Sequence, residues 1–255
     1  MSLRGGTVGA LAMGLLEVLF PPRCAGCGRG PWPFCGRCRA GLQPLSPPWC
    51  RRCGLPLGAE VERCSRCPPP PIVRARAAFA YEGPARAAVH RLKFSGHRRV
   101  GEALAPAMAA MAGPTPDVIA WVPLSRRRRV VRGYDQAEVL ARSVGRALGV
   151  PVVGLLVRVE ETAPQARRPV VERRGAMRGA FRAVRDPPAS VLLVDDVLTT
   201  GATAAACAHA LVEAGAREVG VLTAARALPG PFPARLYSGR GFPSGSVVAR
   251  GEAPR

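Results

Sequence analysis

Lysine, histidine, aromatic residues and long apolar runs are all scarce in this chain. Its 255 residues include 37 Lys and Arg, of which one, Lys93, is a lysine, and three histidines. Three Trp, three Tyr and seven Phe leave few surfaces on which nucleic-acid bases could stack. His90, His97 and His209 lie in helix or turn contexts, so the sequence offers no obvious general base.

The apolar run near the N-terminus, residues 9–20, has twelve residues and contains Glu17. It is too short to span a bilayer and lacks a small-residue cleavage site, so a membrane anchor or signal peptide is the less favoured interpretation. We expect residues 1–20 to form a short amphipathic helix with its leucines on one face. No other segment is long and apolar enough to cross a membrane, and we therefore expect a cytoplasmic protein.

Acidic residues are also few. Against 37 basic residues there are 17 Asp and Glu, which gives a formal net charge of +20. The codon bias of a GC-rich genome would explain most of the arginine excess. A charge of this size still favours anionic partners, either phosphorylated metabolites or nucleic acid, without choosing between them.

Cysteine, in contrast, is abundant, and eight of the nine cysteines lie between residues 24 and 67. They form four Cys-x-x-Cys pairs, and two such turns supply the four thiolates of a tetrahedral zinc site. Disulfides or a redox dithiol fit four repeated pairs without a signal peptide less well. We therefore predict two structural Zn²⁺ sites with full ligand shells. Their ligands are Cys24, Cys27, Cys35, Cys38, Cys50, Cys53, Cys64 and Cys67.

The spacing allows either sequential or interleaved pairing of these turns. Gly28 and Gly54 each follow the second cysteine of a pair and suit a backbone that turns back. Residues 21–67 are thus expected to form a double zinc-ribbon module whose folding depends largely on metal. Cys207, the ninth cysteine, lies in an alanine-rich helix and is expected in the core.

Four prolines at 68–71 are interpreted as a stiff linker between this module and an α/β domain at 72–226. Residues 227–255 are rich in Pro, Gly and Arg without apolar periodicity, which predicts a disordered basic tail. Within the α/β domain we expect strands at 72–81 and 118–122 and helices at 83–94, 101–112 and about 132–148.

Residues 191–203, VLLVDDVLTTGAT, are the most informative stretch. Four apolar residues predict a strand buried on both faces of a parallel sheet, and Asp195 and Asp196 follow at once. The Thr/Gly loop that comes next, before an alanine-rich helix, presents N–H groups and hydroxyls at the positive end of a helix dipole, which suits a phosphate dianion. The carboxylates beside it could hold sugar hydroxyls or Mg²⁺. The plain alternative is a solvated Asp pair before a threonine N-cap.

Two further segments are expected at the same edge of the sheet. The strand at 118–122 runs into Pro-Leu-Ser-Arg-Arg-Arg-Arg, a basic loop that would face the acidic pair. Four arginines are also typical of a solvated turn or a nucleic-acid patch. Lys93 ends a helix, and in an arginine-rich chain it suggests a position that needs a compact ammonium group, unless it is a chance survivor.

The stretch 191–203 resembles the phosphoribosyl diphosphate (PRPP) motif of the type I phosphoribosyltransferases. The resemblance implies that Asp195 and Asp196 hold the ribose hydroxyls and that the loop cradles the 5′-phosphate. The loop residues are Thr199, Thr200, Gly201, Ala202 and Thr203.

A second resemblance rests on five features: the cysteine pairs, the lysine after a leucine, Pro-Leu-x-Arg-Arg-Arg, Arg-Gly-Tyr-Asp-Gln-Ala-Glu and the PRPP motif. Through these features the chain resembles the ComF family over roughly residues 15–226. The resemblance implies an α/β fold, a type I phosphoribosyltransferase-like parallel sheet flanked by helices, behind the zinc-ribbon module. It also implies a link to natural competence and imported single-stranded DNA. The chain departs from the family at Asp135 and Ala176, where asparagine is usual. Gln165 and Arg173 remain candidates for a hood over the substrate base.

We expect PRPP–Mg²⁺ to bind with its diphosphate near Ser125, Arg126 and Arg127. Transfer to a nitrogen nucleophile passes through an oxocarbenium-like centre, so stabilisation of the departing diphosphate matters more than a covalent residue. The competing hypothesis is a non-catalytic module that binds single-stranded DNA and a competence helicase. The predicted catalytic residues are Asp195, Asp196, Arg126 and Arg132, and Lys93 and Gln136 complete the predicted substrate site.

Overall fold

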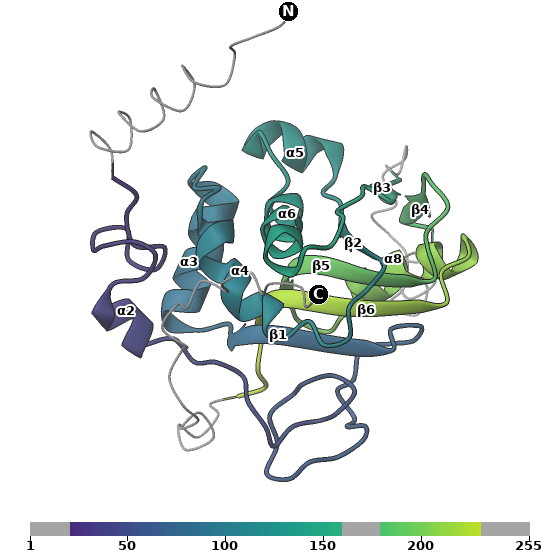
Figure 1. The fold of residues 1–255 in the computed structure, drawn as a ribbon, viewed down its shortest axis with the longest axis horizontal. Coiled ribbons are helices and arrows are strands. Elements are labelled where there is room, and N and C mark those ends of the chain that lie inside the picture. The colour runs from purple at the N-terminus through teal and green to yellow at the C-terminus, as the bar shows by residue number, and fades with distance from the viewer. Residues whose placement is uncertain (1–20, 160–178, 231–255) are drawn as a thin grey trace, which may run out of the picture.

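The centre of the molecule is a four-stranded parallel sheet with strand order β1-β6-β5-β2 (Figure 1). The computed structural model of the protein describes residues 21–159 and 179–230. The sheet confirms the predicted fold class, a helix-flanked parallel sheet with a cysteine-rich N-terminal segment. Its strands are β1 (Arg74–Ala80), β2 (Val118–Trp121), β5 (Ser190–Leu198) and β6 (Glu218–Arg226).

Helices cover both faces of this sheet because its strands are apolar on both sides. Along β5, Leu192 and Val194 pack in a core with α3 (Gly83–Phe94), α4 (Val100–Ala109) and α6 (Gln136–Leu148). Val191 and Leu193 point the other way and pack with α8 (Ala202–Glu213). A small two-stranded antiparallel sheet, β3 (Leu156–Arg158) and β4 (Phe181–Ala183), contacts α8 on that side.

Three sequence predictions of local structure need correction. The strand β5 continues through the acidic pair to Leu198, so the two carboxylates lie within the strand and not after it. The predicted basic loop is a short helix, α5 (Arg126–Arg132), which Ser125 caps by accepting a hydrogen bond from the Arg128 N–H at 3.4 Å. The predicted helix at 132–148 is interrupted at Gly133, where φ is +71°.

The cysteine-rich segment, which includes α2 (Gly36–Ala40), packs directly on the β1 edge of the sheet (Figure 1). The backbone N–H of Leu45 donates to the Ala78 carbonyl at 3.0 Å, and the N–H of Ala75 donates to the Arg52 carbonyl at 2.9 Å. Cys24 shares one core with α3 and α4, whereas Cys50 shares the other core with α8. Residues 68–71 therefore join two parts that have common cores, and do not act as a spacer that holds them apart.

Some predictions fall on residues outside the described ranges. These are the amphipathic helix at 1–20, the hood candidates Gln165, Arg173 and Ala176, and most of the basic tail. Within residues 21–159 and 179–230, no helix has the length and apolar character needed to cross a membrane.

Candidate functional site

The eight clustered cysteines form two separate four-sulfur groups. Cys24, Cys27, Cys35 and Cys38 make the first group, and Cys50, Cys53, Cys64 and Cys67 make the second. Within each group all four sulfur atoms lie within 4.8 Å of one another. The pairing is therefore sequential along the chain, which resolves the choice that the spacing left open.

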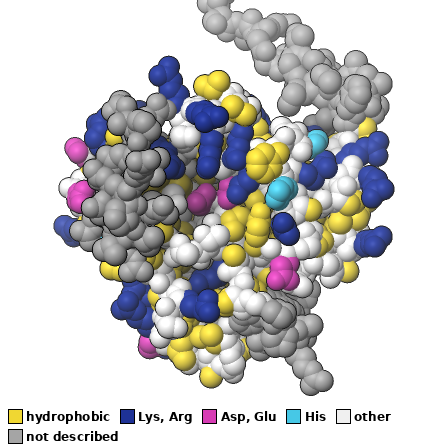
Figure 2. Space-filling view, turned by 180° about the vertical axis from the view of Figure 1, so that it is seen from behind, with side chains coloured by type: hydrophobic (Ala, Val, Ile, Leu, Met, Phe, Trp, Pro, Cys, Tyr) yellow, Lys and Arg dark blue, Asp and Glu magenta, His cyan; other side chains and the backbone are white. Residues whose placement is uncertain are grey.

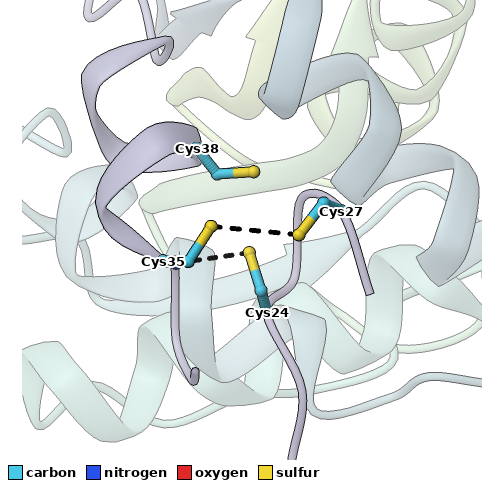
Figure 3. A group of neighbouring side chains, drawn as sticks. All are labelled: Cys24, Cys27, Cys35 and Cys38. Atoms are coloured by element: carbon cyan, nitrogen blue, oxygen red, sulfur yellow. Dashed lines mark hydrogen bonds between the residues drawn. The ribbon is translucent and has the colours of Figure 1, made fainter. Parts of the chain in front are cut away.

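The geometry of both groups fits Zn²⁺. A tetrahedral site with Zn–S bonds of about 2.3 Å places its sulfur atoms about 3.8 Å apart. The distance between Cys27 Sγ and Cys35 Sγ is 3.8 Å, and that between Cys53 Sγ and Cys64 Sγ is 3.6 Å. Figure 3 shows the four sulfur atoms of the first group turned toward a common centre. Zn²⁺ held there would fix the turns that carry these cysteines.

Backbone donors favour the thiolate form of some of these cysteines, Cys24, Cys27 and Cys50, whereas burial raises the pKa of Cys38 and Cys53. The N–H of Cys35 donates to Cys24 Sγ at 3.3 Å, and the N–H of Cys64 donates to Cys50 Sγ at the same distance. The backbone N–H groups of Gly30 and Arg29 lower the pKa of Cys27 to about 6. The positive φ angles of Gly28 and Gly54, +74° and +66°, confirm the turns predicted after Cys27 and Cys53.

The second cysteine group is tied to the sheet by a buried arginine. Arg226, at the end of β6, is 3% exposed, and its guanidinium donates to the Cys53 carbonyl at 2.5 Å. Sequence reasoning missed this residue, because nothing distinguishes it from the other arginines until β6 is recognised as a central strand.

Asp195 and Asp196 point toward opposite faces of the sheet. Side chains alternate along a strand, so Asp195 lies on the face of the sheet that packs against α8. Asp196 lies on the face that packs against α3 and α6. The two residues remain coupled through the backbone, because the N–H of Asp196 donates to Asp195 Oδ1 at 2.7 Å. The pair is thus two different groups, one on each face of the sheet.

Asp196 is the centre of a buried polar cluster. Lys93 Nζ lies 2.7 Å from Asp196 Oδ1, and Gln136 Nε2 donates to Asp196 Oδ2 at 2.8 Å. Arg132 in turn donates to Gln136 Oε1 at 2.7 Å. Asp196 and Gln136 are 5% exposed, so the centre of this network is buried, whereas Lys93 and Arg132 are only partly buried. Four predicted site residues from four separate elements therefore meet here.

Asp195 lies beside the Thr/Gly loop on the other side of β5. It lines a hollow of about 40 Å³ together with Thr199, Gly201 and Thr203. One water takes about 30 Å³ in the liquid, so this hollow has room for about one water-sized group, such as a single phosphate oxygen, and not for a sugar. The loop begins α8 with Gly201 at φ +77°, and the N–H of Ala202 donates to the Thr200 hydroxyl at 3.3 Å.

The electrostatics of Asp195 oppose its ionisation. Burial raises the pKa of Asp195 well above its usual value, and the nearby Asp196 carboxylate raises it further. The ammonium group of Lys93 acts in the opposite direction. A cationic or hydrogen-bond-donating ligand at Asp195 would relieve this penalty.

A larger basic cavity of about 880 Å³ opens on the Asp196 side, between α3 and α5. Figure 2 shows Lys and Arg side chains gathered around a hollow on this face of the molecule, with acidic side chains among them. Ser125 also lines the cavity, whereas Arg126 does not. The cationic residues that line it are Lys93, Arg127, Arg128 and Arg132, and its aromatic residues are Tyr81, Phe94 and Tyr134.

Asp135 does not contribute a free negative charge to this cavity. It is 3% exposed and caps α6, where its carboxylate accepts hydrogen bonds from the N–H groups of Leu124 at 2.8 Å and Ala137 at 3.0 Å. Burial raises the pKa of Asp135, while these backbone donors lower it. The substitution of aspartate for the usual asparagine therefore keeps a capping acceptor.

Comparisons with known proteins agree with this architecture. Residues 15–68 match the family described as "Double zinc ribbon domain". The "DNA utilization protein YhgH" of Salmonella typhi is 34% identical in an alignment of 212 positions, gaps included, that covers 77% of this chain and 92% of that protein. "Competence protein F" of Haemophilus influenzae is 29% identical in an alignment of 209 positions, gaps included, that covers 76% of this chain and 90% of that protein.

A solved structure is similar to part of the chain. The "glutamine phosphoribosylpyrophosphate (PRPP) amidotransferase from B. subtilis" aligns with 53% of this chain and 27% of its own, at 23% identity and a TM-score of 0.36. The chain thus spans about a quarter of the length of that enzyme.

Proposed function

The chain belongs to the ComF family, and from that premise we propose that it binds PRPP with Mg²⁺, or a related ribose phosphate, at the acidic pair. Relatives that it matches over most of their length are named as DNA utilization and competence proteins. We propose that this chain serves the same process, the uptake and use of DNA.

The observation that carries the ligand proposal is the meeting of a phosphate-type loop with a buried lysine–carboxylate cluster. Thr199, Gly201 and Thr203 surround the hollow at the start of α8, and Asp195 lines it as well. Across β5, Lys93 and Gln136 hold the Asp196 carboxylate. A 5′-phosphate held by this loop, with one oxygen in the hollow, would place the attached ribose near the strand that carries both carboxylates.

The carboxylates would then have different tasks. Both oxygens of Asp196 already accept contacts, so Asp196 would position Lys93 and Gln136. Asp195 accepts one N–H at Oδ1, and its other oxygen has no hydrogen-bond partner among the described residues. That oxygen is the one available to a ribose hydroxyl or to the Mg²⁺ that accompanies PRPP.

Phosphoribosyl transfer follows as the proposed chemistry. The bond between ribose C1 and the diphosphate oxygen would break with its electron pair on the diphosphate, while a nitrogen lone pair forms the new C1–N bond. The basic cavity holds Arg127, Arg132 and Lys93, which would stabilise the departing negative charge. Bound Mg²⁺ would neutralise part of the same charge.

Calorimetric titration of the zinc-loaded chain with PRPP and Mg²⁺ tests the binding step. An Asp195→Asn/Asp196→Asn variant should lose binding. Asp117→Asn is the matched control, because Asp117 accepts the Ser190 N–H at the amino end of β5, far along the strand from the pair, and should keep it. Binding that survives in the double variant, or is absent from the wild type, contradicts the proposal. If binding is found, release of diphosphate in the presence of nitrogenous bases then tests transfer.

The second candidate is the non-catalytic module for single-stranded DNA and a helicase partner. The exposed helix α5 favours it, because four consecutive arginines begin this helix and Val130 and Val131 are 75% and 80% exposed on it. A cationic helix with exposed apolar side chains suits a phosphate backbone or a partner protein. Binding of an oligonucleotide without binding of PRPP would favour this candidate.

A further inference from the structure

A second large cavity lies between the first cysteine group and the connection from α3 to α4. Its volume is about 570 Å³, within the range of about 300 to 1,000 Å³ that is usual for small-molecule sites. Gly28, next to Cys27, lines it from the cysteine-rich side, and Gly96 and His97 line it from the α3–α4 connection.

This cavity is lined by cations and by no carboxylate among the described residues. Arg23, Arg91, Arg98 and Arg99 all line it. Arginine guanidinium groups have five N–H donors in a planar fork that matches the oxygens of phosphate groups. Arg99 Nε lies 3.8 Å from Glu102 Oε2, but one carboxylate does not offset four guanidinium groups around one space, so the cavity is complementary to a phosphate-bearing ligand.

Arg91 is incompletely satisfied within the protein. Its Nε atom is buried and has no hydrogen-bond partner in the described part of the chain. Its Nη2 atom lies 3.0 Å from His97 Nε2. Because arginine can only donate, the ring nitrogen must accept, which makes His97 neutral with its proton on Nδ1. Burial and the charge of Arg91 lower the pKa of His97, in agreement with this arrangement.

The wall of the cavity also has an aromatic and apolar part. Trp32 lines it and packs against the core that contains Cys24 and Phe34. Pro21 and Pro22 add further apolar surface. An indole anchored in this way offers a stacking surface for a flat heterocycle.

We propose that this cavity is a nucleotide site, in which Trp32 stacks with the base and the arginines, Arg23 and Arg99 among them, bind the phosphate. It is distinct from the ribose phosphate site proposed above. Arg91 and Lys93 are two residues apart on α3, about 200° around the helix, so their side chains project from opposite faces of that helix. The two cavities share only the lining residue Gly96.

The test uses the zinc-loaded full chain carrying Asp195→Asn/Asp196→Asn, in which the ribose phosphate site is disabled. Adenosine 5′-monophosphate without Mg²⁺ is the probe, and equilibrium dialysis is the measurement. We expect binding to persist in this background and to weaken about tenfold or more in Arg23→Gln and Arg99→Gln, because each loses a charged donor. Arg39→Gln, an exposed arginine on α2 that does not line the cavity, is the matched control and should bind normally.

A second readout follows the aromatic wall. With Trp49→Phe and Trp121→Phe, Trp32 remains as the single tryptophan, and the probe should quench its fluorescence. Inorganic phosphate should bind more weakly than the nucleotide. If an oligothymidylate strand competes with the probe, the site binds nucleotides that are part of a strand. If it does not compete, the site binds free nucleotides.

Three results would overturn the proposal: no binding of the probe in the Asp195→Asn/Asp196→Asn background, equal binding in Arg23→Gln, Arg99→Gln and Arg39→Gln, or phosphate that binds as tightly as the nucleotide. Zinc content of two equivalents and a cooperative thermal unfolding transition in every variant show that both the zinc ribbons and the α/β domain are folded. The outcome does not depend on PRPP binding, because the acidic pair is already replaced.

Discussion

Pro68 lies directly against Gly201. A Cβ atom placed on Gly201 would come within 2.7 Å of Pro68 Cβ, and Gly201 is buried with φ +77°. Pro68 follows Cys67, a member of the second cysteine group. Gly201 belongs to the proposed phosphate loop and is the N-cap residue of α8. The loop therefore rests on the second zinc ribbon.

Gly201→Ala should be strongly destabilising. Alanine in the left-handed region costs about 1 kcal/mol, and overpacking against Pro68 adds about 2 kcal/mol. We expect the free energy of unfolding, measured by urea denaturation with zinc present, to fall by about 3 kcal/mol. Gly149→Ala is the control, because Gly149 has φ +68° and a Cβ there would meet nothing within 4 Å. Equal losses for the two variants would show that the contact with Pro68 has no energetic weight.

Lys93→Met should destabilise the protein more than the loss of a surface ion pair does. Lys93 and Asp196 have side chains 20% and 7% exposed, so the substitution leaves a buried carboxylate without its cation. We expect a loss of about 3 kcal/mol in the free energy of unfolding. Arg142→Ala removes a pair with Glu138 whose arginine is 56% exposed, and should cost less than about 0.5 kcal/mol.

A double variant provides the decisive comparison for this pair. Lys93→Met/Asp196→Leu removes both charges and should recover part of the stability lost in Lys93→Met. If the double variant is less stable than the single one by the full cost of a second substitution, the two side chains are not coupled.

Asp195→Asn should make the ligand-free protein more stable at neutral pH. The folded-state pKa of Asp195 is raised, so the folded state binds more protons than the unfolded state between the unfolded pKa, about 4, and the folded value. Stability from this group is fully present below about pH 4 and is lost as the pH rises through the folded pKa. Asparagine cannot ionise and avoids that loss.

The measurement is the melting temperature of wild type and Asp195→Asn across pH, both loaded with zinc. The difference between the two proteins should grow as the pH rises from about 5 toward neutrality, because zinc contributes equally to both. A melting temperature that is lower in Asp195→Asn at neutral pH would contradict the assigned direction of the pKa.

The parts of the fold that the sequence predicts are those with strong local signals. The helix at 83–94 agrees with α3 at both ends, since Gly83 and Pro84 begin it and polar residues follow it. Cys207 is fully buried in α8, as its alanine-rich context indicates. The zinc ligands follow from spacing alone, because each Cys-x-x-Cys turn is complete within four residues.

The strand β6 shows what local signals miss. Its sequence, EVGVLTAAR, contains glycine and alanine, which have low strand propensity. Its stability comes from pairing with β1 and β5 on its two sides, residues that are distant in sequence. The contact between Lys93 and Asp196 likewise joins residues about a hundred positions apart, and the solitary lysine was the one signal that pointed to it.

Loss of zinc at the two sites should have different effects on the phosphate loop. Cys27→Ser and Cys67→Ser should each reduce the zinc content from two equivalents to one, because each removes one thiolate of a complete group. Of the two cysteines, only Cys67 is next to Pro68, which packs against Gly201. The second cysteine group also contacts β6, because the Cys53 carbonyl accepts a hydrogen bond from Arg226. Hydrogen exchange of the amides at 199–203 should therefore accelerate in Cys67→Ser and stay close to wild type in Cys27→Ser. Equal exchange in the two variants would show that the second zinc ribbon does not hold the loop, whereas acceleration in Cys27→Ser alone would assign that support to the first.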